Sequence, residues 1–277
     1  MRTRIALLLG IVLVAGACAG PGGGGAGSPS VAPKTFAAGS SMAAIVAKGK
    51  LVCGVKFDVI AFGFKNPTTG EIEGLDADLC RELAKELGVS AELTEAVSKN
   101  RIPFLKEDKV DLIISTFTAN EERRKEVDFS HVYYKAGQSI LVKKESTVQK
   151  VEDLVGKKVC TGEGSTSEKN LRAKGVTDLL LFQTYTEGAQ ALVDGRCEAV
   201  STDDSILFGL AKQFPGTELR GTLFSDEPLA IGIKKGRTDL VEFVNGVLEA
   251  MKADGRLKAL YDKHIKPFTG KDVEVPF

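Results

Sequence analysis

The feature that most constrains the fold is an alternation of strand-like and helix-like segments that occurs twice along the chain. The first occurrence has the order strand, helix, strand, helix, strand, over residues 50–59, 75–88, 91–97, 102–110 and 111–116. Leucine recurs every fourth residue from Leu75 to Leu87, and Gly88 follows where helices often end. This order predicts a parallel sheet covered by helices.

The alternation restarts in the second half of the chain. The same five-segment order is found over residues 156–162, 165–175, 179–185, 186–196 and 197–204. A long amphipathic stretch over 239–265 follows, with a predicted break at Gly255. The repetition predicts two similar α/β lobes, each with a mostly parallel sheet flanked by helices.

Two extended segments, 129–144 and 223–235, connect these units. Two crossings imply that one lobe is inserted within the other, with hinge strands between them. We expect the first lobe to contain residues 46–134 and 229–277, and the second lobe residues 135–228. Ligands of such sheets bind beyond the carboxyl ends of the strands, so a cleft between the lobes is the expected site.

The N-terminus has the pattern of an export signal. A basic start, MRTR, precedes thirteen mostly apolar residues, of which the last three, before Cys18, are small. This end resembles a bacterial lipobox, which implies a signal peptide over 1–17 and lipidation of Cys18. An ordinary secretory signal is the alternative. Residues 18–45 are rich in Gly, Ser, Pro and Ala, which predicts a tether. We expect an extracytoplasmic domain held at the membrane by the lipid.

Composition and motifs argue against several functional classes. The chain has 37 basic and 37 acidic residues, so nothing indicates nucleic-acid binding. It has two histidines, His131 and His264, and no Gly-x-Ser-x-Gly, Walker or His-Glu-x-x-His motif. These absences weaken hydrolase, nucleotide and zinc-site interpretations. We expect a monomeric binding protein with no catalytic residue, cofactor or metal.

Polar side chains follow the predicted strands at matching ends of both lobes. Thr116 and Thr118 lie at the end of the strand over 111–116, and Arg123 comes about one helical turn later. Asp203 lies at the end of the strand over 197–204. Thr118-x-x-Glu121 has the spacing of a capping box. The ordinary explanation for Thr118 is that it caps a helix, and the ordinary explanation for Arg123 is that it is a solvated charge on that helix.

The second lobe offers a similar helix start. Ser165-x-x-Glu168 has capping-box spacing, and the free amides of a helix N-terminus, such as that of Thr166, attract anions. Arg123, Thr118 and the Thr166 amide suit a carboxylate, whereas Asp203 and Thr116 can accept from an ammonium group. The combination predicts a zwitterionic ligand.

Four long motifs then indicate a family. The chain resembles family 3 extracellular solute-binding proteins, the amino-acid receptors of ABC importers, from about Lys50 to Lys266. The resemblance rests on EGLDADLCRELAKELG, KVDLIISTFTANEERRKEVDFSHVYYKAG, DLVGKKVCTGEGSTSE and DGRCEAVSTDD. It implies a two-lobed periplasmic-binding-protein fold (type II), ABC permease partners, a ligand α-carboxylate held by Arg123, Thr118 and the Thr166 amide, and an α-amine held by Asp203.

The segment Ser98-Lys99-Asn100-Arg101 bears on specificity. Glutamate/aspartate receptors of this family carry Ser-x-x-Arg there, and a cation after the first strand, where this chain has Lys56. Lys56 and Arg101 would be two unpaired cations beside a neutral ligand, and unpaired buried charges are costly. We therefore expect glutamate or aspartate. If both cations face solvent or pair with local acids such as Asp58, a glutamine or asparagine receptor is the alternative.

Three further expectations complete the prediction. Phe62 is a candidate wall of the ligand pocket, whereas Phe64 is expected in the core. The protein binds without chemistry; an amino-acid sensor for a signalling kinase and a cyclohexadienyl-dehydratase-like enzyme are the rivals. The four cysteines of the exported part are either buried thiols or disulfides. Pairing within lobes, as Cys53–Cys80 and Cys160–Cys197, would leave lobe closure free.

Overall fold

The computed structural model describes residues 35–277. The predicted signal peptide, the lipidation site at Cys18 and most of the predicted tether lie outside the described residues. Helix α1 (Ser41–Lys48) begins within the segment predicted as a tether. Ser40 caps this helix by accepting a hydrogen bond from the Ala43 amide at 3.1 Å. The tether prediction was therefore wrong over residues 41–45, which are helical.

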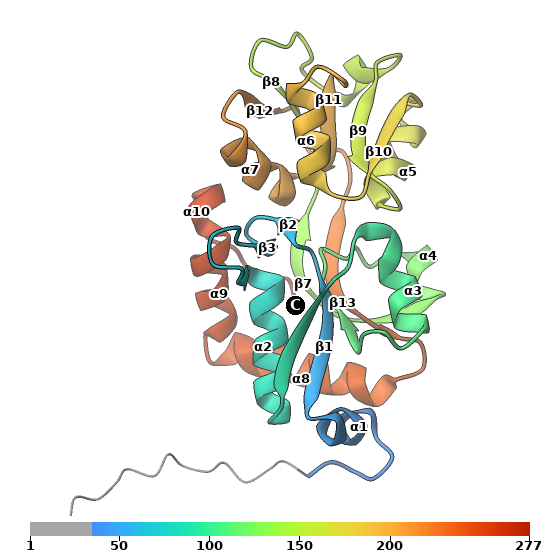
Figure 1. Ribbon diagram of the computed structural model, residues 1–277, viewed down its shortest axis with the longest axis vertical. Coiled ribbons are helices and arrows are strands. Elements are labelled where there is room, and N and C mark those ends of the chain that lie inside the picture. Colours follow the sequence, from blue (N-terminus) through green and yellow to red (C-terminus); the bar gives the residue numbers. More distant parts are fainter. Residues whose placement is uncertain (1–34) are drawn as a thin grey trace, which may run out of the picture. The chain divides into compact units, whose positions relative to one another are not determined.

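The first lobe is built on a five-stranded sheet with the order β5-β1-β6-β13-β7 (Figure 1). Its strands are β1 (Lys50–Val55), β5 (Ser90–Glu95), β6 (Leu112–Ile113), β7 (Val127–Ala136) and β13 (Glu227–Lys234). Strand β1 pairs in parallel with β5 and β6, whereas β13 pairs antiparallel with β6 and β7. The sheet is therefore mixed, and its antiparallel half comes from the predicted crossings.

Helices cover both faces of this sheet. They are α2 (Leu75–Leu87), α3 (Arg101–Lys106), α8 (Thr238–Ala253) and α9 (Arg256–His264). Leu51 and Cys53 of β1 share a hydrophobic cluster with α2, α8 and α9, whereas Val52 packs in a cluster with Leu105 of α3. Successive residues of β1 thus point to opposite faces, and burial on both faces explains why the strand is almost wholly apolar.

Short elements complete the first lobe. They are the small sheet β2 (Asp58–Val59), β3 (Gly63–Lys65) and β4 (Ile72–Glu73), the 3-10 turn η1 (Ser98–Asn100), α4 (Glu121–Arg124) and α10 (Lys266–Thr269). The predicted break between the last two long helices is confirmed, because Gly255 separates α8 from α9 with a left-handed φ of 84°.

The second lobe repeats this plan with the order β10-β9-β11-β8-β12. Its strands are β8 (Gln138–Lys143), β9 (Val159–Gly162), β10 (Leu179–Phe182), β11 (Ala199–Asp203) and β12 (Thr217–Arg220), and its helices are η2 (Val151–Leu154), α5 (Thr166–Ala173), α6 (Tyr185–Val193) and α7 (Asp204–Gln213). Strand β9 pairs in parallel with β10 and β11, whereas β8 is antiparallel to β11 and β12. Neither α7 nor β12 was predicted from the sequence.

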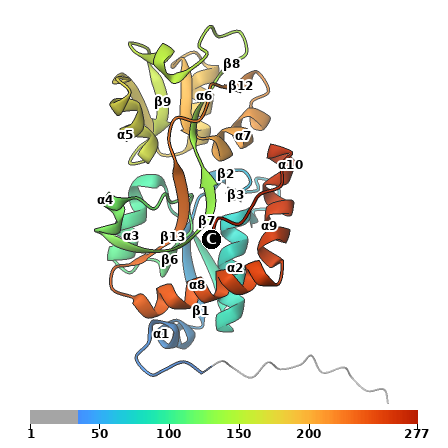
Figure 2. The same ribbon diagram turned by 180° about the vertical axis from the view of Figure 1, so that it is seen from behind.

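The chain passes between the two sheets twice. It leaves the first sheet after Ala136, enters the second at Gln138, and returns between Arg220 and Glu227. Figure 1 shows β7 and β13 rising from the first lobe toward the second, and Figure 2 shows the same two connections from behind. The fold is the predicted two-lobed α/β arrangement with two hinge crossings.

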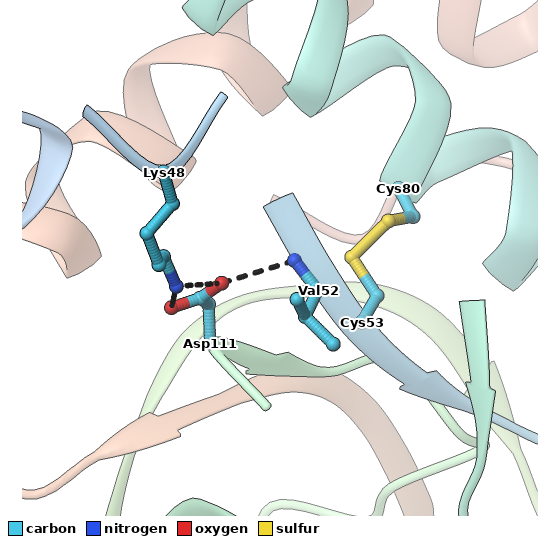
Figure 3. Close-up of a disulfide and its surroundings, with 5 residues drawn as sticks. All are labelled: Lys48, Val52, Cys53, Cys80 and Asp111. Atoms are coloured by element: carbon cyan, nitrogen blue, oxygen red, sulfur yellow. Dashed lines mark hydrogen bonds and ion pairs between the residues drawn. A yellow bond between two sulfur atoms is a disulfide. The ribbon is translucent and has the colours of Figure 1, made fainter. Parts of the chain in front are cut away.

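Each lobe contains one disulfide. Cys53 of β1 is joined to Cys80 of α2, with 6.3 Å between their Cα atoms (Figure 3). Cys160 of β9 is joined to Cys197, with 5.9 Å between their Cα atoms. Beside the first bond, the Asp111 carboxylate accepts hydrogen bonds from Lys48 Nζ and, at 3.0 Å, from the Val52 amide (Figure 3). Both disulfides lie within a lobe, so neither restricts the movement of one lobe against the other.

In residues 35–277, none of the helices has both the length and the apolar character needed to cross a membrane.

Candidate functional site

The two lobes contact each other directly. Lys99 Nζ lies 2.8 Å from Glu163 Oε2, and the Tyr185 amide donates to Asp58 Oδ2 at 2.6 Å. A Cβ atom at Gly164 would lie 2.9 Å from Lys99 Cα, so only glycine allows this approach. The structure therefore represents a closed arrangement of the lobes.

Arg123 is buried at this interface rather than solvated. Its side chain is 8% exposed, Nη1 donates to the Thr118 carbonyl at 2.9 Å, and its guanidinium carbon lies 4.9 Å from the centre of the Phe117 ring. Burial lowers the pKa of Arg123. The cap of α4 is Asn120, whose side chain accepts from the Arg123 amide at 2.9 Å. The prediction of a capping box at Thr118 was therefore wrong.

Arg101 is the first residue of α3 and is also buried. Nε donates to the Ser98 carbonyl at 3.1 Å, and Nη1 donates to the carbonyls of Ser115 and Thr116 at 3.0 and 2.8 Å. Its guanidinium carbon lies 4.5 Å from the Phe117 ring centre. Burial, followed by the charge of Arg123, lowers the pKa of Arg101 to about 9. Arg101 therefore ties helix α3 to the segment that follows β6.

Lys56 follows β1 and has no exposed surface. Its Nζ donates to Ser98 Oγ at 2.9 Å and lies 5.3 Å from the centre of the Tyr185 ring, which belongs to the second lobe. Burial lowers the pKa of Lys56 to about 7, and the nearby Asp58 carboxylate partly opposes this shift. Lys56 and Ser98 are thus brought together, as expected, at the interface.

Asp76 is a buried carboxylate that sequence reasoning missed. It accepts hydrogen bonds from the Thr116 amide at 2.9 Å and from the Tyr133 hydroxyl at 2.7 Å. Burial raises its pKa to about 6. Thr116 has a φ of 42°, which residues other than glycine rarely adopt, so the Asp76 contact stabilises a strained turn. The available signal was an acid on the apolar face of the helix, one turn before Cys80.

Glu227 is the second functional candidate that was missed. It begins β13, is 2% exposed and accepts four hydrogen bonds. Thr118 Oγ1 and Thr166 Oγ1 donate to Oε2 at 2.7 and 2.8 Å, and Asn170 Nδ2 and Ser225 Oγ donate to Oε1 at 2.8 and 2.7 Å. An acidic residue beside a buried crossing strand was the only sequence signal.

The predicted second-lobe residues lie at the same interface. Asp203 ends β11 and is 4% exposed; burial, followed by the charge of Glu227, raises its pKa to about 8. Ser165 caps α5 by accepting from the Glu168 amide at 3.2 Å. In a capping box the Glu168 side chain would accept from the Ser165 amide. It accepts from the Gly164 amide instead, at 3.3 Å, so this half of the predicted capping box is displaced by one residue.

Phe62 belongs to the hydrophobic core. Its side chain has no exposed surface and packs edge-on against Tyr134, with ring centres 5.3 Å apart. Phe64, which was expected in the core, is only half-buried in β3.

The buried charges around the cleft are balanced. The cations Lys56, Arg101 and Arg123 interact with the carboxylates of Asp76, Asp203 and Glu227. The sequence-based count of two excess cations omitted Asp76 and Glu227. A net charge near zero suits a ligand that carries no net charge. Among residues 35–277, no group of three or more His, Cys, Asp or Glu side chains could hold a metal ion.

The fold and this site define the class of protein. Two α/β lobes joined by two crossings, with buried charges where the lobes meet, form a type II periplasmic-binding-protein fold built to enclose a small polar solute. The chain belongs to family 3 of the bacterial extracellular solute-binding proteins, whose model matches residues 51–267.

Similar proteins carry more specific names. The ABC transporter glutamine-binding protein GlnH of Bacillus subtilis (strain 168) is 43% identical over 264 residues, or 94% of each chain. The glutamine-binding protein of Geobacillus stearothermophilus is 45% identical and covers 73% of this chain and 79% of that protein. A solved L-cysteine receptor of Neisseria gonorrhoeae has a TM-score of 0.79 at 34% identity, covering 85% and 97% of the two chains. These relatives are binding proteins rather than enzymes.

Proposed function

We propose that this protein binds glutamine between its lobes and delivers it to an ABC permease. The observation that carries the proposal is the balance of three buried cations against three buried carboxylates, which leaves no uncompensated charge for a ligand side-chain carboxylate. The similarity to two glutamine-binding proteins supports the same ligand. The expectation of glutamate or aspartate gives way to the alternative, a glutamine or asparagine receptor.

In this proposal, Arg123 and the Thr166 amide hold the ligand α-carboxylate. Arg123 supplies a fork of donors, and the amide at the first position of α5 has no partner within the helix. Asp203 receives the α-ammonium, which favours the ionised form of a carboxylate whose pKa burial has raised to about 8. Lys56 and Ser98 then lie beside the ligand amide.

The working cycle is closure without chemistry. Glutamine first docks on Arg123 and Thr116 of the open first lobe. The second lobe then closes, because only the closed state adds contacts from Thr166 and Asp203. The permease recognises the closed form.

Calorimetry tests the ligand assignment. Residues 34–277 form one compact unit. A protein that begins at residue 34 is titrated with glutamine, glutamate, asparagine, aspartate and arginine. We expect glutamine to bind at least about tenfold more tightly than glutamate at pH 7.5, because glutamate adds a charge to a balanced site. Tighter binding of glutamate than of glutamine would contradict the proposal.

We also propose that the mature protein is anchored by a lipid on Cys18, as the signal-like N-terminus indicates. The full-length protein expressed in a bacterial host should incorporate radiolabelled palmitate and sediment with membranes. The Cys18→Ala variant should lose both properties. Equal labelling of both proteins would refute the anchor.

A further inference from the structure

Glu227 is placed so that it contacts both lobes. The backbone of residues 117–119 pairs with residues 228–230 of β13, which holds Thr118 beside Glu227. Thr166 and Asn170 approach the same carboxylate from helix α5 of the second lobe. Arg123 donates to the Thr118 carbonyl, and its charge interacts with Glu227.

The hydrogen bonds of Glu227 leave it no capacity for a ligand. An ionised carboxylate offers about four acceptor positions, and four donors within 2.8 Å occupy them. Glu227 therefore acts on a ligand only through its partners.

The same bonds fix what Thr118 and Thr166 can do. A threonine hydroxyl has one proton, and each of these two residues donates it to Glu227 Oε2. Their oxygen atoms keep only lone pairs. Such an oxygen can accept a hydrogen bond from an ammonium group, but it cannot donate one to a carboxylate. This differs from the expectation that the Thr118 hydroxyl contributes a donor to the ligand carboxylate.

We propose that Glu227 is a positioning residue that turns the Thr118 and Thr166 hydroxyls into paired acceptors for the ligand α-ammonium group. Because one hydroxyl comes from each lobe, Glu227 completes this pair only when the lobes are closed. The inference rests on the proposed function in one respect, that the ligand is an α-amino acid, and it does not depend on which one.

The test combines a variant with an altered ligand. The substitution Glu227→Gln leaves one acceptor oxygen and introduces an NH₂ donor, so it must reverse the hydrogen bonds of part of the cluster. The affinity for the amino acid that binds most tightly is compared with the affinity for its analogue that lacks the α-amine. For glutamine, this analogue is glutaramic acid. We expect Glu227→Gln to weaken amino-acid binding by about 10- to 100-fold and glutaramic acid binding by less than about threefold.

A matched control is Glu163→Gln, which removes an exposed interlobe ion pair with Lys99 and leaves the hydroxyls intact. It should change the affinity for either ligand by less than about threefold. If Glu227→Gln does not fold, as judged by circular dichroism, Thr118→Val replaces it, with the same selective loss expected.

Equal losses for both ligands, or no loss for the amino acid, would overturn the role of Glu227. The glutamine assignment is tested separately. If the protein prefers another amino acid, the comparison uses that amino acid and its analogue without the α-amine. Absence of any α-amino-acid binding by the unaltered protein would overturn both.

Discussion

At the scale of single residues, Arg101 shows how a charge that is unfavourable at a helix start can stabilise the fold. A cation in the first turn of a helix is repelled by the helix dipole. Here the guanidinium instead satisfies the carbonyls of Ser98, Ser115 and Thr116 in a buried location. Without the arginine these carbonyls would lose the guanidinium donor, so Arg101 stabilises the turn that follows β6.

Arg101→Met should therefore destabilise the protein even without ligand. We expect urea unfolding of the ligand-free protein to show a loss of about 2–4 kcal/mol, because buried carbonyls lose their donors. The control Lys106→Met removes an exposed cation from the same helix and should change stability by less than about 0.5 kcal/mol. Unchanged stability of Arg101→Met, with a lost preference among ligands, would instead assign Arg101 to ligand recognition.

Lys56 gives the ligand preference a pH dependence. Burial lowers its pKa to about 7, and the charged groups around it are Asp58, Arg101, Asp203 and Glu95. As pH rises through 7, Lys56 loses the proton that would stabilise a glutamate side chain, whereas glutamine is less affected. Titration of Asp203 influences both ligands alike, because both carry an α-ammonium group, and cancels in the ratio of their affinities.

The ratio of glutamine to glutamate affinity should therefore rise by about tenfold from pH 6 to pH 8. Calorimetry at both pH values measures it, and Lys56→Met should give a ratio that varies little with pH. A constant ratio in the unaltered protein, or the same rise in Lys56→Met, would show that another group discriminates between the ligands.

The residue scale also shows why the sequence predicted only part of the site. Arg123, Thr118 and Asp203 were recognisable because they follow predicted strands at matching ends. Asp76 and Glu227 were not, since a carboxylate inside a helix pattern or beside a crossing looks solvated until packing shows that it is buried. Charge counts made without the buried acids therefore favoured an acidic ligand over the glutamine that we propose.

At the scale of elements, long periodic segments were predicted well and short ones poorly. Helix α2 was predicted as 75–88 and spans Leu75–Leu87, because its leucines recur at helical spacing and Gly88 ends it. Strand β6 was predicted over 111–116 but spans only Leu112–Ile113, and the four-residue strand β12 was not predicted, because the extent and pairing of short strands depend on neighbours distant in sequence. For the same reason the antiparallel half of each sheet was not predicted.

The disulfides offer a test at this scale. The two disulfides close loops with sequence separations of 27 and 37 residues. Because each bond restricts the unfolded chain, it should stabilise the folded protein by roughly 3–4 kcal/mol. Replacing both cysteines of either pair by serine should lower the free energy of unfolding in urea by up to that amount. Ligand affinity should change by less than about threefold, since each bond lies within one lobe. A much larger loss of affinity would show that the disulfide positions the binding site.

At the scale of the whole domain, binding depends on how readily the two lobes close. The contacts that span the interface include buried groups that converge on Glu227, the hydrogen bond from the Tyr185 amide to Asp58, and exposed ion pairs at the rim, Lys99–Glu163 and Glu122–Lys169. The buried contacts determine the geometry of the closed state. The rim pairs affect mainly its population, because exposed charges are weakly coupled and screened by salt.

Charge reversal at the rim tests this division. Glu163→Lys places two cations together in the closed state and should weaken glutamine binding by about three- to tenfold at low salt, because the apparent affinity falls with the fraction of molecules able to close. The double variant Lys99→Glu/Glu163→Lys restores opposite charges and should recover most of the affinity. In about 0.5 M salt the single variant should approach the unaltered protein. A loss that persists in high salt, or that the double variant does not repair, would mean that Glu163 contributes to the binding geometry itself and not only to closure.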